Sequence, residues 1–143
     1  MSRKTARDRA FKLVFEYIFM KEIDDELMEE YLSESDADER LDDRAIEDEK
    51  KYVRDVYFGV ANKFEYLFDK IEKLSIGFKS HRIFKVDLAI LLVAAYELEF
   101  MPSVPKKVSI NEACELAKTY STEKSVGFIN GILAKMIEDN AKV

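Results

Sequence analysis

Residues that bind metals or form disulfides are almost absent from this 143-residue chain, which has one cysteine and one histidine. A single cysteine cannot form an internal disulfide, and Cys114 with His81 cannot supply the His/Cys cluster of a zinc site. Cys114 lies on an apolar helical stripe, so we expect it to be a small core residue. We therefore expect no metal or other cofactor.

Proline and glycine are scarce too, with two and four copies respectively. These residues make most tight turns, and the sustained alternation of apolar and polar residues typical of strands is missing as well. A chain of this length can bury a core of its own. The sequence therefore predicts an all-α protein with six or seven helices, in a single domain over residues 1–143.

No apolar run is long enough to cross a bilayer, which takes about 20 residues as a helix. The longest run, residues 86–101, is interrupted by Asp87, Glu97 and Glu99, and it predicts a buried helix. The charged N-terminus also lacks the apolar segment of a secretory signal. We expect a cytoplasmic protein without membrane attachment.

Motifs of common enzymes are missing as well. The sequence contains neither G-x-x-x-x-G-K-[ST] nor G-x-G-x-x-G, which cradle phosphates, nor the nucleophile motif G-x-S-x-G. The carboxylates are plentiful, but they belong to charge runs. The sequence therefore favours a binding protein over an enzyme.

The charge is strongly segregated, although the net value is only −6. Residues 1–12 carry five basic side chains against one acidic, whereas residues 22–50 carry fifteen acidic against three basic. The acidic block is typical of a solvated connection between helices, and it could also repel nonspecific nucleic acid.

Apolar residues at helical spacing predict the individual helices. Pro102 and Pro105 should end the most apolar one, because proline cannot continue a helix. The first expected helix begins at Ser2 or Thr5 and ends near Met20. Three further helices should cover residues 25–32, 46–74 and 82–100.

Two more helices should form a hairpin near the C-terminus. Ser109 and Glu112 have the spacing of a capping box, which predicts a helix start there. In the second helix, Gly127 and Gly131 are four residues apart, and we expect close packing to require them. The two segments read Val108-Ser-Ile-Asn-Glu-Ala-Cys-Glu-Leu-Ala-Lys118 and Ser125-Val-Gly-Phe-Ile-Asn-Gly-Ile-Leu-Ala-Lys135.

This hairpin resembles the C-terminal signature of the NusB family of bacterial transcription antitermination factors. Ala94-Ala-Tyr-Glu-Leu98, Val104-Pro105 and an Ala-Arg-Asp-x-Ala pattern over residues 6–10 extend the resemblance along most of the chain. It implies a compact fold of two small helical bundles. It also implies binding of boxA, a single-stranded RNA element of ribosomal RNA operons, together with the ribosomal protein NusE in the RNA polymerase elongation complex.

The basic N-terminal cluster indicates a negatively charged ligand independently of the family resemblance. Cations at a helix N-terminus oppose the helix dipole, so something negative should compensate Arg3, Lys4 and Arg7. Arg3 and Arg7 should share a face with charges suited to RNA phosphates, although a merely solubilising terminus would look similar. The resemblance favours RNA and implies contacts from Arg3, Lys4, Arg7 and Arg9.

The resemblance also implies other contact residues. Phe128 would stack on a base, although helical spacing alone would place it in the core. Lys124, one turn before Phe128, adds a cation at a position where many relatives have an acid. Phe15 stands where relatives commonly carry tyrosine, so its ring could contact RNA without a hydroxyl group. Arg82 and Asp87 match polar NusE contacts, although Asp87 could equally be a solvated position.

Two other functions are compatible with the sequence. The chain could be a helical module that binds protein alone, as a homodimer with its basic face covered. It could also assist a ribosomal RNA methyltransferase in trans, because NusB-like domains precede some of these enzymes.

Overall fold

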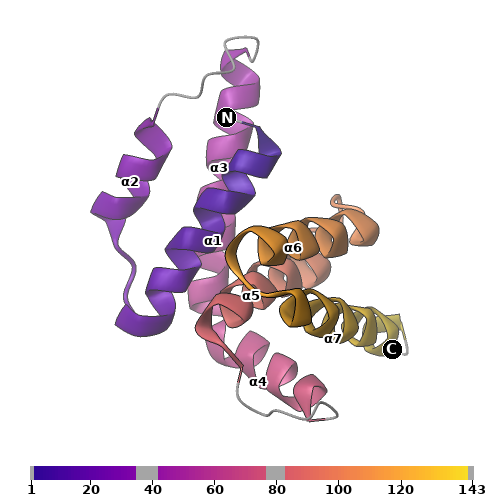
Figure 1. Ribbon diagram of the computed structural model, residues 1–143. Helices are drawn as coiled ribbons and strands as arrows, with labels where there is room; N and C mark the ends of the chain where they lie inside the picture. Colours follow the sequence, from indigo (N-terminus) through magenta and orange to yellow (C-terminus); the bar gives the residue numbers. More distant parts are fainter. Residues whose placement is uncertain (1, 35–41, 77–82, 142–143) are drawn as a thin grey trace.

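The computed structural model describes residues 2–34, 42–76 and 83–141. These residues form helices and contain no strand, which confirms the predicted all-α class. The helices are α1 (Arg3–Met20), α2 (Asp25–Ser33), α3 (Asp43–Asn62), α4 (Phe64–Ser75), α5 (Lys85–Phe100), α6 (Lys106–Tyr120) and α7 (Glu123–Ala141) (Figure 1).

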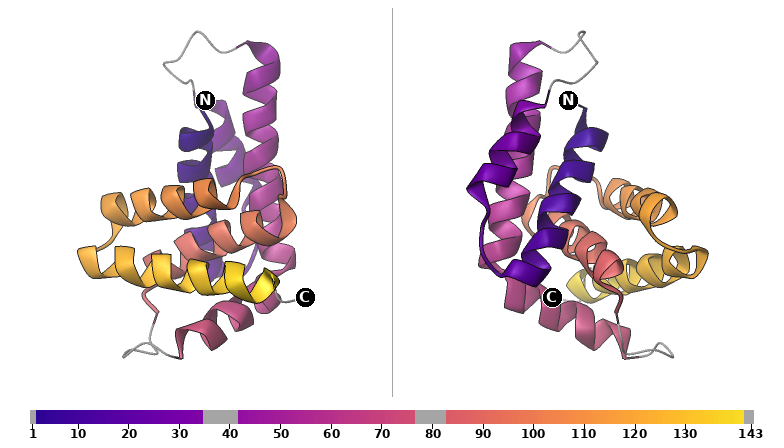
Figure 2. Two further views of the ribbon diagram at one scale, coloured as in Figure 1. Left: turned by 90° about the vertical axis from the view of Figure 1, so that its right-hand side faces the viewer. Right: turned by 60° about the vertical axis from the view of Figure 1, so that its left-hand side comes forward.

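The helices form two small bundles, as expected (Figures 1 and 2). One contains α1, α2 and α3, and the other contains α4 to α7. Helix α5 contacts α1 and α3 as well as α4, α6 and α7, so it joins the two bundles. Ala89, Ile90 and Leu91 are fully buried on this helix. This confirms α5 as the central, most buried element.

The bounds predicted for α1 are confirmed. Ser2 caps the helix by accepting a hydrogen bond from the Thr5 N–H at 3.1 Å. The helix ends where Lys21 adopts a left-handed conformation with φ 58°, and the Lys21 N–H bonds the Tyr17 carbonyl. Polar capping and a left-handed residue are the common signals for the two ends of a helix.

The predicted single helix over residues 46–74 was wrong, because Lys63 interrupts it with φ −109° and ψ 17°. The Lys63 N–H still bonds the Gly59 carbonyl at 3.0 Å, so the chain changes direction with almost no loop. Phe64 then packs 5.5 Å from the Tyr17 ring, between ring centroids. The apolar stripe continues through the bend, which is why periodicity alone did not locate it.

The predicted capping box was also wrong. Helix α6 begins at Lys106, directly after Pro105, whose φ of −59° already suits a helix. Ser109 therefore lies inside the helix, where it is buried and donates to Glu97 Oε1 at 3.0 Å. The predicted start of the central helix at residue 82 lies outside the described residues.

Two glycines differ in what they do for packing. A Cβ atom on Gly59 would overlap the ring of Tyr96, so α3 and α5 approach closely there. A Cβ atom on Gly127 would meet nothing within 4 Å, so the expectation that packing requires Gly127 was wrong.

Among the described residues, no helix combines the length and apolar character needed to cross a bilayer. The same residues contain no group of three or more His, Cys, Asp or Glu side chains placed to hold a metal ion. The Cys114 thiol is half-buried, and burial raises its pKa. A raised pKa disfavours the reactive thiolate form.

Candidate nucleic-acid interface

One face of α1 carries cations and aromatic rings at helical spacing. Lys4, Asp8, Lys12, Phe15 and Phe19 follow one another by three or four positions, so they share a face. Lys4 and Phe19 are exposed, and the Lys12 side chain is 40% exposed. Lys12 binds Asp8 at 3.0 Å, and the rings of Phe15 and Phe19 meet edge to face. We call this face the α1 stripe; its mixture of cations and rings suits single-stranded RNA.

Tyr120, the last residue of α6, extends the α1 stripe. Its ring lies 5.0 Å from that of Phe11, and its hydroxyl group donates to Asp8. The Lys12 ammonium lies 5.7 Å from the ring centroid. The hydrogen bond to Asp8, followed by burial, raises the pKa of Tyr120. The ring is therefore fixed beside a cation while 39% of the residue stays exposed.

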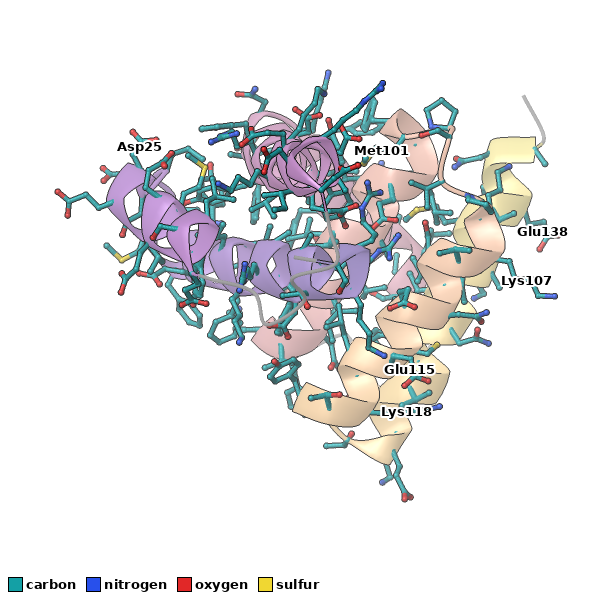
Figure 3. All side chains as sticks on the ribbon, turned by 90° about the horizontal axis from the view of Figure 1, so that it is seen from above. Asp25, Met101, Lys107, Glu115, Lys118 and Glu138 are labelled. Atoms are coloured by element: carbon teal, nitrogen blue, oxygen red, sulfur yellow. The ribbon has the colours of Figure 1, made fainter. Side chains whose placement is uncertain are left out.

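Tyr120 borders two grooves of about 300 Å³ each, which is the lower end of the range for ligand pockets. The polar groove lies between α1 and α6. Figure 3 labels Glu115, one of its lining residues, on α6. The aromatic groove lies beside α1, α2 and α5. The polar groove is lined by Lys4, Thr5, Arg7, Asp8, Glu112, Glu115, Leu116, Thr119 and Tyr120. The aromatic groove is lined by Phe11, Lys12, Phe15, Glu16, Tyr31, Val86 and Tyr120.

Arg7 is buried, so the expectation that it presents its charge to solvent beside Arg3 was wrong. Only 5% of the residue is exposed. Its Nε and Nη2 atoms each donate to the Glu97 carboxylate at 2.8 Å. Tyr52 also donates to that carboxylate at 2.6 Å, and Ser109 donates at 3.0 Å. This network joins α1, α3, α5 and α6 and fixes the helix that carries the stripe.

Electrostatics keep this network charged. Burial alone would lower the pKa of Arg7, but the hydrogen bonds and negative charge of Glu97 outweigh it and leave the pKa raised. Burial, aided by the charge of Glu97, holds the pKa of Tyr52 well above its ordinary value. Arg7 therefore stays positive and Tyr52 stays a hydrogen-bond donor at neutral pH.

Arg3 and Arg9 bind carboxylates of the acidic block. Arg3 Nε lies 2.6 Å from Glu49 Oε2. The Arg3 guanidinium group lies 4.5 Å from the centre of the Tyr52 ring. Arg9 is buried, with Nη2 3.4 Å from Glu34, while its buried Nη1 has no hydrogen-bond partner in the described part of the chain. The negative compensation expected for the N-terminal cations is thus partly internal.

Comparison with known proteins identifies the family. The model of the NusB family matches residues 4–138. The chain belongs to the NusB family. Two relatives named transcription antitermination protein NusB show how close the match is. The protein from Acetivibrio thermocellus is 41% identical, over 96% of this chain and 90% of its own length. The protein from Clostridium acetobutylicum is 38% identical, over 98% of both chains.

Solved NusB structures have the same fold. T. maritima NusB is 33% identical, with a TM-score of 0.74 over 97% of this chain and 92% of its own. A chain from a crystal structure of antitermination factors NusB and NusE in complex with dsRNA is 27% identical. Its TM-score is 0.72 over 96% of both chains. The NusB assignment expected from the motifs is confirmed.

The two candidate contact residues of α7 differ in exposure. Lys124 lies in the first turn and is exposed, whereas Phe128, one turn later, is half-buried and packs against the core. The ring therefore has one side toward the protein and retains some accessible surface. A role for both residues in RNA binding remains a prediction.

Asp87 is not the solvated position that the sequence also allowed. It is buried, and it accepts hydrogen bonds from Ser121 at 2.6 Å and Ser125 at 2.7 Å. The carboxylate thus ties the start of α5 to the turn between α6 and α7. Contact of Asp87 with NusE remains a prediction, and Arg82 lies outside the described residues.

Sequence reasoning missed Tyr120 as a candidate contact residue, whereas Lys12 belongs to the basic cluster that the sequence indicates. Tyr120 had only a weak signal, an aromatic residue at the end of an amphipathic helix. Its contacts with α1 come from residues more than 100 positions away, which helical periodicity cannot indicate.

Proposed function

We propose that this protein is a transcription antitermination factor that binds boxA-type single-stranded RNA together with NusE. The observation that carries the proposal is the α1 stripe with Tyr120, a row of cations and aromatic rings in a NusB-family fold. Lys4, Phe19 and Tyr120 are exposed in this row, whereas Lys12 and Phe15 are half-buried. Lysine charges attract phosphates, while aromatic rings stack on unpaired bases.

The binding mode follows from which side chains are accessible. Lys4 and Lys12 contact phosphates, and Tyr120 and Phe15 stack on bases. Arg7 acts mainly from inside the protein, by fixing α1 against α5 and α6 through Glu97. The protein would act as a single domain, without covalent chemistry.

The proposed assembly contains a protein partner as well as RNA. The name of the similar complex pairs NusB with NusE, and we assign the NusE contact to the start of α5, near Arg82 and Asp87. Phe84 stands there with 65% of its surface exposed, an apolar contact suited to a protein partner. Together the two proteins would tether RNA to the RNA polymerase elongation complex in the cytoplasm.

The experiment is a fluorescence anisotropy titration of boxA RNA, a scrambled single strand and a duplex, with and without NusE. The proposal predicts preference for single-stranded boxA, strengthened by NusE and weakened by salt. Equal or absent binding of all three RNAs, even with NusE present, would contradict it.

A matched pair of lysine variants tests the interface. Lys4→Gln removes an exposed charge of the α1 stripe, and Lys73→Gln removes one from α4, where the Lys73 side chain is 72% exposed. Each lost phosphate contact should reduce the log–log salt slope by about 0.7 for a single strand. Lys4→Gln should show this reduction and Lys73→Gln should not. Equal slopes, with concentration-dependent dimerisation, would favour a protein-binding homodimer instead.

A further inference from the structure

We propose that the polar groove between α1 and α6 binds one unstacked cytosine or adenine base of the RNA through its amino group. This inference rests on the proposed function and adds specificity to it. The groove has a volume of about 300 Å³ and opens beside Tyr120 and Lys4. Sequence-specific recognition of RNA usually targets such splayed-out bases, which stack on aromatic rings and expose their hydrogen-bonding edges.

The groove is lined by more negative than positive side chains, which disfavours a phosphate as its occupant. Asp8, Glu112 and Glu115 line it, and Lys4 is the exposed cation among the lining residues. Carboxylates repel phosphate but accept hydrogen bonds from the amino groups of bases. The lining therefore favours a base edge with N–H donors.

Glu112 is the acceptor left open for such a donor. Asp8 already binds Lys12 and the Tyr120 hydroxyl group, and Glu115 binds Lys118 at 3.2 Å (Figure 3). Within the described part of the chain, no hydrogen bond reaches the half-buried Glu112 carboxylate. A half-buried acceptor is partly desolvated, so a hydrogen-bond donor from a ligand stabilises it.

Arg7 supplies a donor near this acceptor. Its Nε and Nη2 atoms are both used by Glu97, which leaves Nη1 as the remaining nitrogen of a residue that lines the groove. Arg7 and Glu112 also attract each other electrostatically. Cytosine and adenine present an amino group next to a ring nitrogen that accepts a hydrogen bond, which matches this donor and acceptor. Uracil presents a carbonyl oxygen where cytosine has its amino group, and a carboxylate would repel it.

A lysine or arginine side chain of a protein partner could also enter an acidic groove. RNA is favoured because the groove opens onto the α1 stripe, where Lys4, Lys12 and Tyr120 can hold the neighbouring nucleotides. The experiment below separates these two occupants.

The test uses short RNAs that differ at one position at a time, with cytosine or adenine replaced by uracil. At one position of the RNA, the wild-type protein should bind the RNA with cytosine or adenine about tenfold more tightly than the RNA with uracil. In Glu112→Gln the side-chain amide can donate to the uracil oxygen, so this preference should fall to about twofold or less. The control variant Glu138→Gln, which removes an exposed carboxylate of α7 outside the groove, should keep the preference.

Binding of RNA without a base preference at any position would overturn this inference and leave the proposed function intact. Absence of RNA binding would overturn both. A preference that survives in Glu112→Gln, or a Glu112→Gln variant that loses affinity for NusE alone, would also overturn the inference. Circular dichroism shows whether Glu112→Gln folds, and Glu112→Asp, which withdraws the carboxylate, should reduce the preference independently.

Discussion

The guanidinium group of Arg7 and the carboxylate of Glu97 form a two-pronged ion pair between α1 and α5, with both nitrogen–oxygen distances at 2.8 Å. Tyr52 and Ser109 also donate to this carboxylate, so its burial is compensated by hydrogen bonds. The pair fixes the position of α1, and with it the α1 stripe and one wall of the polar groove.

Arg7→Met should lower the free energy of unfolding by about 3–5 kcal/mol, because it leaves the buried Glu97 charge without its partner. Urea denaturation measures this loss. Lys4→Ala, which removes an exposed cation three residues away, should change stability by less than about 0.5 kcal/mol. The double variant Arg7→Met/Glu97→Met should recover part of the loss. Equal losses of stability in Arg7→Met and Lys4→Ala would contradict this account.

Stability should fall at high pH partly through Tyr52. Burial, then the charge of Glu97, raises the pKa of Tyr52 well above its ordinary value, whereas an unfolded tyrosine ionises near pH 10. The contribution of Tyr52 to the free energy of unfolding is therefore fully present below about pH 10. It is lost as the pH rises further, because only the unfolded state releases the tyrosine proton. Tyr52→Phe should remove this contribution.

The measurement is urea denaturation of both proteins from about pH 8 to pH 11, within which the unfolded tyrosine titrates. The stability difference between wild type and Tyr52→Phe should shrink as the pH rises above about 10. Other tyrosines with raised pKa values cancel in this difference. A constant difference would contradict the predicted role of Tyr52.

Asp87→Asn should lower the free energy of unfolding by about 1–3 kcal/mol, because a buried charge-assisted hydrogen bond to Ser121 or Ser125 is lost. Ser121→Ala/Ser125→Ala should destabilise as well, since it leaves the buried carboxylate unpaired. Thermal unfolding of the three proteins checks this prediction. Full stability in both variants would show that Asp87 does not hold the α6–α7 turn.

Two glycine substitutions should act in opposite directions. Gly127→Ala should stabilise the protein by about 0.5–1 kcal/mol, because alanine is the better helix former and its methyl group has free space. Gly59→Ala should destabilise it, because the methyl group would displace the Tyr96 ring. Denaturation midpoints compare them directly, and the same sign for both would contradict the packing described here.

Helical periodicity predicted the class, the ends of α1 and the buried character of α5, because each depends on local spacing and local capping. It missed the bend at Lys63, since the apolar stripe runs through it without a break. It also misplaced the start of α6, because Ser109 has the spacing of a capping residue but donates instead to Glu97. That carboxylate comes from another helix, which local patterns cannot reveal.

The candidate site was harder to predict than the fold. A basic cluster indicates the class of ligand, but exposure decides which cations reach it. Arg7 and Arg9 are buried, while Lys4 and Lys12 remain accessible. Only the packing of α6 against α1 brings Tyr120 to the same surface.

The most direct test of the proposed interface compares two exposed tyrosines by fluorescence anisotropy with single-stranded boxA RNA. Tyr120 borders the α1 stripe, whereas Tyr66 lies on α4 with 52% of its surface exposed. Tyr120→Ala should weaken binding by about 1–3 kcal/mol, the value of one stacked base, and Tyr66→Ala should leave it unchanged. Equal affinities of both variants and the wild type would contradict RNA binding along the α1 stripe.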